Sequence, residues 1–336
     1  MSRPRFLPDN FTLALVVTVT LASFLPARGS VAHGFEWATT AAISLLFFLH
    51  GAKLSREAVV AGATHWRLHL LVLASTFVMF PVLGLLLKPV LAPLVTPDLY
   101  LGILFLCCLP ATVQSAIAFT SMARGNIPAA VCSASASTLI GVFVTPILVS
   151  LVVTSNGGDA GPSLGSIGRI LLQLMLPFVL GQLARPFIAA WVKKQAKLVK
   201  LVDQGSILLV VFTAFSAAVV EGLWQQIPAV SLLGLVVVCC VLLALALGVT
   251  RYASRKLGFS TEDEVTIVFC GSKKSLASGI PMAKVLFASH AVGAIVLPLM
   301  LFHQIQLMVC AVLAQRYAQR REEAPAAAVA GEARPS

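Results

Sequence analysis

Residues 262–287 read EDEVTIVFCGSKKSLASGIPMAKVLF, and this stretch is the most informative part of the chain. It is apolar enough to enter a membrane, but Gly271 and Ser272 interrupt it, and Lys273 and Lys274 follow at once. A lysine at membrane depth costs at least about 2.5–3.5 kcal/mol on insertion scales. Lys273 lies about ten residues inside the segment, roughly 15 Å along a helix, so its ammonium is too deep to snorkel easily to water. We therefore predict that at least one of the two lysines faces a polar cavity.

The composition of the whole chain indicates a membrane protein. Of the 336 residues, 58% are hydrophobic and 11% are charged, and the mean hydropathy is +0.94. Ordinary soluble domains carry about 25% charged residues, and a soluble core of this size could not enclose so much apolar surface. A water-soluble enzyme is thereby excluded. The seven cysteines lie in apolar runs without a CxxC spacing, so we interpret them as buried thiols.

The net charge of +11 does not indicate nucleic acid as a partner. The basic residues are scattered through short segments between apolar stretches, and 18 of the 24 lie on one side if the chain crosses a membrane after each apolar stretch. Only four lie on the other side, and Lys273 and Lys274 complete the count. Lysine and arginine accumulate on the cytoplasmic side of membrane proteins, so this bias predicts that both termini are cytoplasmic.

Ten apolar stretches are long enough to cross a hydrocarbon core, which needs about 20 residues. They cover residues 11–27, 35–54, 67–87, 99–122, 127–153, 167–187, 204–224, 228–250, 262–288 and 291–315. We predict an all-α, polytopic protein with a single transmembrane domain over residues 1–315 and a disordered cytoplasmic tail over 316–336. The first stretch resembles a secretory signal peptide, but we expect it to remain in the protein as an uncleaved helix.

Ten spans divide into two groups of five, over residues 11–153 and 167–315. An odd number of spans in each half forces the halves into opposite orientations, which is the inverted repeat of many secondary transporters. The fourth and ninth stretches then occupy equivalent places. They are also the two stretches with the most interruptions, which favours two discontinuous helices that cross in the middle of the protein.

The fourth stretch, YLGILFLCCLPATVQSAIAFTSMARGN, contains Pro110 followed by Thr112, Gln114 and Ser115. Proline removes a backbone donor and obstructs the preceding turn. One interpretation is a simple proline kink whose carbonyls are satisfied by hydroxyl groups. The other is an unwound helix whose backbone and side chains line a binding cavity.

The fifth stretch adds polar candidates in VCSASASTL, residues 131–139. Ser133 and Ser137 are four residues apart and share a helix face, whereas Ser135 points away. Small residues also serve merely to let helices approach closely, so a lining role and a packing role stay open. With Thr138, these serines join the candidate binding set of Pro110, Thr112, Gln114, Ser115, Gly271, Ser272, Lys273, Lys274 and Ser275.

Two histidines, His50 and His303, fall inside apolar stretches. Each could make a hydrogen bond between helices or relay protons. No acidic residue lies at the centre of a predicted span, so carboxylate-driven cation coupling has no obvious residue. GxSxG, HExxH and paired aspartates do not occur in the spans. We therefore expect a protein that is not an enzyme and that holds no cofactor or metal.

Four strings carry a resemblance to a known family: FFLHGAKLSREAV, LPATVQSAIAFTSMARGN, TIVFCGSKKSLASGIPMA and LPLMLFHQIQLMVCAVLA. They resemble the bile acid:sodium symporter (BASS) family, in the branch that contains the seventh human bile-acid-carrier paralogue, the yeast calcium-homeostasis regulator and bacterial YfeH-type symporters. The resemblance extends from Asn10 to about Arg316. It implies a panel domain (spans 1, 2, 6 and 7), a core domain (3–5 and 8–10), and a substrate site beside the crossing of spans four and nine.

The resemblance also places the family's sodium ligands. A Ser–Asn pair of the family falls at Gln114 and Ser115, its acidic ligand at Phe269 and its glutamine at Lys273. An ammonium at a cation site would repel sodium or replace it as a tethered charge. The resemblance implies Na⁺ as the coupling ion, but these residues argue against sodium, and His303 or His50 could couple transport to H⁺ instead.

Two functions follow as hypotheses. The first is a secondary-active transporter in the bacterial inner (plasma) membrane that moves a small organic anion by alternating access. Its lysines would supply positive charge and its hydroxyl and amide groups neutral hydrogen bonds. The second is a regulator of ion, notably calcium, homeostasis that keeps the carrier fold and transports little or nothing. The expected partners are the lipid bilayer and an anionic small molecule, and the sequence names no protein partner.

Overall fold

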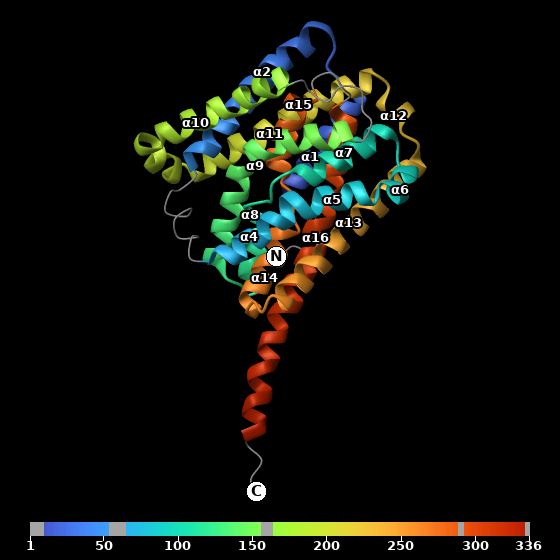
Figure 1. Cartoon of the computed structure of the whole chain (residues 1–336). Helices are drawn as coiled ribbons and strands as arrows, with labels where there is room; N and C mark the ends of the chain where they lie inside the picture. The colour runs from blue at the N-terminus through green and yellow to red at the C-terminus, as the bar shows by residue number, and fades with distance from the viewer. Residues whose placement is uncertain (1–9, 54–64, 156–163, 288–291, 333–336) are drawn as a thin grey trace.

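The structure is a computed structural model that describes residues 10–53, 65–155, 164–287 and 292–332 (Figure 1). All regular secondary structure in these ranges is helical, which confirms the predicted all-α class. Within the described ranges, seven helices are long and apolar enough to cross a membrane. They cover Gly29–Lys53, Trp66–Leu86, Ile127–Val152, Leu174–Lys194, Ala196–Val220, Ala229–Lys256 and Val292–Gln319.

The first half of the chain folds into two long helices, a series of short ones and a further long helix. These are α1 (Asn10–Phe24), α2 (Gly29–Lys53), α4 (Trp66–Ala74), the π-helix η2 (Ser75–Met79), α5 (Phe80–Leu86), α6 (Lys88–Leu91), the 3₁₀-helix η3 (Ala92–Leu94), α7 (Pro97–Cys108), α8 (Gln114–Met122) and α9 (Ile127–Ser155). The second half consists of α10 (Leu164–Lys194), α11 (Ala196–Val220), α12 (Leu223–Gln226), α13 (Ala229–Lys256), α14 (Thr261–Gly271), α15 (Leu276–Leu286) and α16 (Val292–Glu332).

Helices occupy all ten apolar stretches, and the fourth and ninth are each divided into two helices. The residues between the sixth and seventh stretches, 188–203, are also mostly helical, because α10 continues to Lys194 and α11 begins at Ala196. Polar residues end a membrane span without ending a helix. Lysine is a good helix former and interacts favourably with the carbonyl end of the helix dipole, so the basic last turn prolongs α10.

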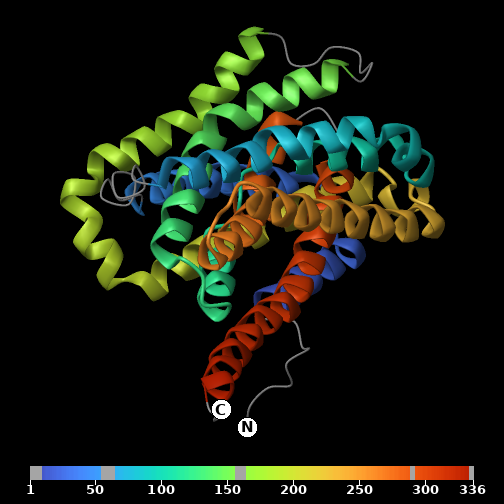
Figure 2. The ribbon, with the colours of Figure 1, turned by 60° about the horizontal axis from the view of Figure 1, so that its bottom comes forward.

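The last helix is longer than the tenth apolar stretch, which ends at residue 315. Helix α16 continues to Glu332 and projects from the bundle in Figures 1 and 2. Residues 316–324, RYAQRREEA, consist mostly of good helix formers. Because they extend a helix that already exists, their helical form needs no new nucleation.

The helices pack in two groups. In the first group, α2 packs against α10 and α11, and α1 packs against α11. In the second, α4, α5, α7–α9 and α13–α16 pack around one another, and α11 contacts this group through α15 and α16. The α2–α10 contact depends on two glycines: a Cβ atom on Gly51 would lie 2.1 Å from the carbonyl oxygen of Phe178, and one on Gly181 would lie 2.0 Å from that of Phe48. Small residues of this kind let membrane helices approach closely.

Candidate functional site

The two interrupted helices meet at their interruptions. Helix α7 ends at Cys108 and α8 begins at Gln114, while α14 ends at Gly271 and α15 begins at Leu276. The backbone N–H of Ser275, in the second interruption, donates to the carbonyl oxygen of Pro110, in the first, at 2.9 Å. Proline cannot donate a helical hydrogen bond, so the chain leaves helical geometry there and exposes this carbonyl to the other segment.

Lys274 lies at the centre of this junction and is completely buried. Its Nζ donates to three carbonyl oxygens, those of Thr76, Cys107 and Leu109, each at 2.8 Å. The same nitrogen lies 4.2 Å from the centre of the Phe80 ring. An ammonium has three donor hydrogens, so these three carbonyls use all of them.

The acceptors of Lys274 are backbone groups that the helix interruptions leave without helical partners. Cys107 and Leu109 stand at the C-terminal end of α7, where carbonyl groups are unsatisfied and carry the negative end of the helix dipole. Thr76 lies in η2, whose π-helical turns displace the normal hydrogen-bond pattern. Lys274 therefore acts as an internal cation. Its ammonium neutralises the partial negative charge of carbonyl groups in two irregular backbone segments and links these segments.

Gln306 on α16 holds the backbone of Lys274 from the other side. Its Oε1 accepts from the Lys274 N–H at 2.9 Å, and its Nε2 donates to the Lys274 carbonyl at 3.0 Å. Nε2 also lies 2.8 Å from Nδ1 of His303. His303 was among the predicted candidates and Gln306 was not, although a glutamine inside an apolar stretch is itself a signal; the structure buries its side chain completely.

Lys273 is also completely buried, but its ammonium has a different environment. Nζ donates to the carbonyl oxygen of Ser115 at 3.0 Å, and it lies 3.9 Å from the ring centre of Phe119 and 5.3 Å from that of Phe269. Among the described residues, this carbonyl is the one hydrogen-bond acceptor of the ammonium. The two aromatic faces stabilise the charge without using its remaining N–H groups.

The other candidates in the second interruption have structural contacts. The Ser275 hydroxyl accepts the N–H of Ser278 at 3.2 Å and so caps α15. The Ser272 hydroxyl donates to the carbonyl of Val268 at 2.6 Å. Gly271 is closely packed, because a Cβ there would lie 3.2 Å from side-chain atoms of Ser75 and Thr250.

The candidates Thr112, Gln114 and Ser115, at and just before the start of α8, have different environments. The hydroxyl groups of Thr112 and Ser115 lie 2.7 Å apart. Thr112 is buried, whereas the side chain of Gln114 is exposed. Of these residues, Ser115 is the one that the structure brings into direct contact with a lysine, through its backbone carbonyl rather than its hydroxyl.

The polar residues of α9 make hydrogen bonds with three different segments. The Ser137 hydroxyl accepts the N–H of Ala111 at 3.0 Å, inside the first interruption. The Ser133 hydroxyl instead lies 2.7 Å from Nδ1 of His69 on α4, and Thr138 donates to Ala134 in its own helix at 3.0 Å. Ser135 is half-buried. The structure therefore brings Ser137 to the junction and leaves Ser133 beside α4.

His50 lies outside the junction, in the first group of helices. Its Nδ1 lies 2.8 Å from the carbonyl oxygen of Leu46, one turn earlier in α2. One turn later in α2, Lys53 donates to the carboxylate of Asp203 on α11. His303, in contrast, contacts the junction through Gln306. The structure thus separates two histidines that the sequence alone does not distinguish.

Asn126 is a further residue that sequence reasoning missed. Its Nδ2 donates to Asp263 at 2.9 Å, and its N–H donates to the hydroxyl of Thr266 at 3.0 Å, so the turn after α8 is bound to the first turns of α14. Gly125 is required there, because a Cβ would lie 2.6 Å from a side-chain carbon of Val265. The ARGN string at residues 123–126, which is part of the family resemblance, is the available sequence signal for this contact.

The described residues contain no group of three or more His, Cys, Asp and Glu side chains that could hold a metal ion. The polar chemistry at the junction consists of two ammonium groups, backbone carbonyls, hydroxyls and one amide. Such a set can hold an anion at an ammonium or an alkali cation at the carbonyls.

Known proteins resemble this chain over nearly its whole length. Residues 9–319 match the SBF-like CPA transporter family (DUF4137). The uncharacterized protein PA2026 of Pseudomonas aeruginosa is 69% identical over 97% of this chain and 98% of its own length. The Escherichia coli K12 protein named "Putative symporter YfeH" is 61% identical over 94% of each chain. The rat sodium/bile acid cotransporter 7 is 27% identical over 90% of each chain. This protein therefore belongs to the SBF-like CPA transporter family, the bile acid:sodium symporter family of integral membrane transporters.

Proposed function

We propose that this protein is a secondary-active transporter that moves a small organic anion by alternating access, with Lys273 as the anion-binding cation. The observation that carries the proposal is the burial of two lysines, each completely inaccessible, where two interrupted helices meet. Buried charge is costly unless it is paired. The junction offers these ammonium groups carbonyls and aromatic rings, and no carboxylate among their contacts in the described residues.

The two lysines have different roles in this proposal. Lys274 uses its three N–H groups on carbonyl oxygens, so it is a fixed internal cation. Lys273 uses one N–H on Ser115 and keeps two for a ligand. Helices α8 and α15 begin beside the junction, and their N-terminal dipole ends favour negative charge.

The Lys274 ammonium also affects which ion gradient could drive transport. Carbonyl groups at unwound helices are the groups that coordinate Na⁺ in many secondary transporters. Here the Lys274 ammonium occupies three such carbonyls, which supports sodium-independent transport. His303, joined to Lys274 by Gln306, is the candidate for proton coupling.

The membrane arrangement in this proposal has ten spans in two inverted halves, with both termini in the cytoplasm of a bacterial inner membrane. The packing of α1, α2, α10 and α11 as one group and the paired interruptions in equivalent halves support it. The 18-to-4 distribution of lysine and arginine supports the orientation.

The decisive experiment measures the thermal stability of the purified protein with a series of organic mono- and dicarboxylates and sulfonates, in sodium, potassium and choline salts. A ligand of the folded state present at 100 times its dissociation constant stabilises by about 2.7 kcal/mol. We expect anion-dependent stabilisation in the wild type and in Lys284→Gln, which removes a half-buried lysine later in the same stretch. We expect none in Lys273→Gln. Binding that survives in Lys273→Gln contradicts the anion role.

Flux measurements separate transport from the alternative role in ion homeostasis. The same anion, placed outside liposomes that contain only this protein, should accumulate inside under an imposed proton gradient. Sustained, substrate-dependent flux excludes a regulator that keeps the carrier fold without transporting. Binding without flux would instead favour that regulator.

A further inference from the structure

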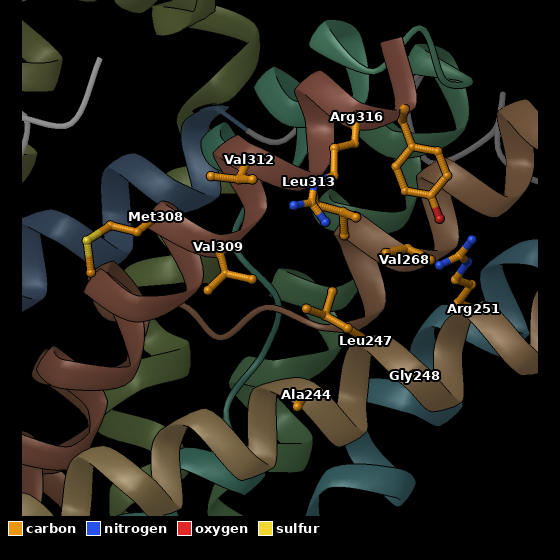
Figure 3. Close-up of a pocket in the computed structure, with 11 residues that line it drawn as sticks. Ala244, Leu247, Gly248, Arg251, Val268, Met308, Val309, Val312, Leu313 and Arg316 are labelled. Atoms are coloured by element: carbon orange, nitrogen blue, oxygen red, sulfur yellow. The ribbon is translucent and has the colours of Figure 1, made fainter. Parts of the chain in front are cut away.

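A second candidate site lies away from the two lysines, in a groove of about 550 Å³ between α13, α14 and α16 (Figure 3). Its size is within the range of small-molecule sites, about 300–1,000 Å³. Its walls are mostly apolar, and the residues used below are Ala244 and Leu247 on α13, and Met308, Val309 and Val312 on α16. Met308 is 61% exposed and Val312 is 43% exposed, so the groove is open along α16.

One end of the groove is basic. Figure 3 shows Arg251 on α13 and Arg316 on α16 at this end, and Met308 at the opposite end. Arg316 is exposed. The basic end coincides with the ends of two candidate membrane spans, at Lys256 and Gln319, whereas the apolar walls extend into the spans.

A polar network fixes the basic end. Glu264 on α14 accepts from Arg255 at 2.8 Å and from the Tyr317 hydroxyl at 2.8 Å, and it lies 3.5 Å from Arg251. The Arg251 guanidinium also lies 6.0 Å from the ring centre of Tyr317. Arg251 and Arg255 therefore stand beside one glutamate, and Arg316 at the same end of the groove leaves an excess of positive charge.

The dimensions of the groove fit one leaflet of a bilayer. Met308 precedes Arg316 by eight residues in α16, which corresponds to about 12 Å along a helix. One leaflet contributes about half of a hydrocarbon core of about 30 Å. A phosphate at the arginines would thus place an acyl chain along the apolar wall for most of a leaflet.

We propose that this groove binds an anionic phospholipid, with its phosphate between Arg316 and Arg251 and one acyl chain along α13 and α16. Arginine forms bidentate hydrogen bonds with phosphate oxygens, and basic pockets between membrane helices bind anionic headgroups. The groove lies on the side that the charge distribution assigns to the cytoplasm. Its lining residues include neither Lys273 nor Lys274, so the lipid site is separate from the proposed anion site.

The test titrates the purified full-length protein in detergent with dioleoyl phosphatidylglycerol or dioleoyl phosphatidylcholine, and counts bound lipids by native mass spectrometry. We expect phosphatidylglycerol to bind at least about tenfold more tightly, which corresponds to about 1.4 kcal/mol, because both lipids carry the same phosphate but phosphatidylcholine adds a trimethylammonium group whose positive charge the arginines repel. Arg316→Gln should remove about this tenfold preference. Val312→Trp should weaken phosphatidylglycerol binding by filling the groove while both arginines remain.

Two matched variants separate this site from general surface charge and from the lysine junction. Lys200→Gln removes another exposed basic side chain, on α11, and should leave binding unchanged. Lys273→Gln should also bind phosphatidylglycerol normally. Any one of four results would overturn the proposal. These are equal binding of the two lipids, equal loss of phosphatidylglycerol binding in Arg316→Gln and Lys200→Gln, unchanged binding in Val312→Trp, and loss of binding in Lys273→Gln. The melting temperature without lipid verifies that each variant is folded.

Discussion

The ammonium of Lys274 donates a hydrogen bond of 2.8 Å to the carbonyl oxygen of Leu109, a residue 165 positions earlier in the chain. This bond joins the loop between α14 and α15 to the point where α7 ends. It places a positive charge at the carbonyl end of a helix, where the helix dipole favours it. The interruption of one helix and the lysine of the other are therefore parts of one arrangement.

Replacing Lys274 with methionine should strongly destabilise the protein. The substitution leaves three buried carbonyl oxygens without their donor, and an unsatisfied buried group costs about 1–3 kcal/mol. We expect a fall in melting temperature of several degrees in detergent. Lys197→Met, which removes an exposed lysine on α11, should change it little. Equal melting temperatures for the two variants would show that the ammonium is not needed to hold the two segments together.

Removal of the Lys274 ammonium should create sensitivity to sodium. In Lys274→Ser, the carbonyl oxygens of Thr76, Cys107 and Leu109 would be free to bind a small cation. We expect sodium chloride to raise the melting temperature of this variant relative to choline chloride, and to have no such effect on the wild type. Lys273→Ser is the control, because Lys273 contacts a single carbonyl among the described residues. A sodium effect in the wild type as large as in the variant would contradict the internal-cation role.

Ser137 and Ser135 offer a matched pair on α9. Ser137 accepts the buried N–H of Ala111 at 3.0 Å, so Ser137→Ala should cost about 1–3 kcal/mol of folding free energy. Ser135 is half-buried and lies on another face, so Ser135→Ala should change stability by less than about 0.5 kcal/mol. Denaturation of the two variants in the same detergent measures the difference. Similar losses for both would mean that the first interruption does not depend on the Ser137 hydroxyl.

The glycines at the α2–α10 contact should not tolerate a methyl group. Gly181→Ala would place Cβ 2.0 Å from the Phe48 carbonyl oxygen and force the two helices apart. We expect a clear fall in melting temperature. Gly205→Ala on α11 meets no atom within 4 Å, and it should leave stability unchanged or raise it, since alanine favours helix by about 1 kcal/mol over glycine. A stable Gly181→Ala variant would refute the close packing of α2 and α10.

Part of the site could be predicted because its causes are local. Pro110 interrupts a helix through its own ring, and the depth of Lys273 and Lys274 follows from the apolar residues on either side. The partners of these lysines could not be predicted in the same way. Gln306 and Ser133 show the difference: the first was not predicted, and the second could not be distinguished from Ser137 by sequence, although Ser133 contacts His69 on another helix.

The sequence by itself determined that this is a helical membrane protein with two interrupted stretches and two lysines in one of them. These properties depend on hydropathy, proline and glycine, which act on neighbouring residues. Only the tertiary structure decided that Lys274 is fully hydrogen-bonded, that Lys273 lies between two aromatic rings, and that two arginines end an apolar groove. These contacts join residues up to 198 positions apart, and helix packing alone brings them within hydrogen-bonding distance.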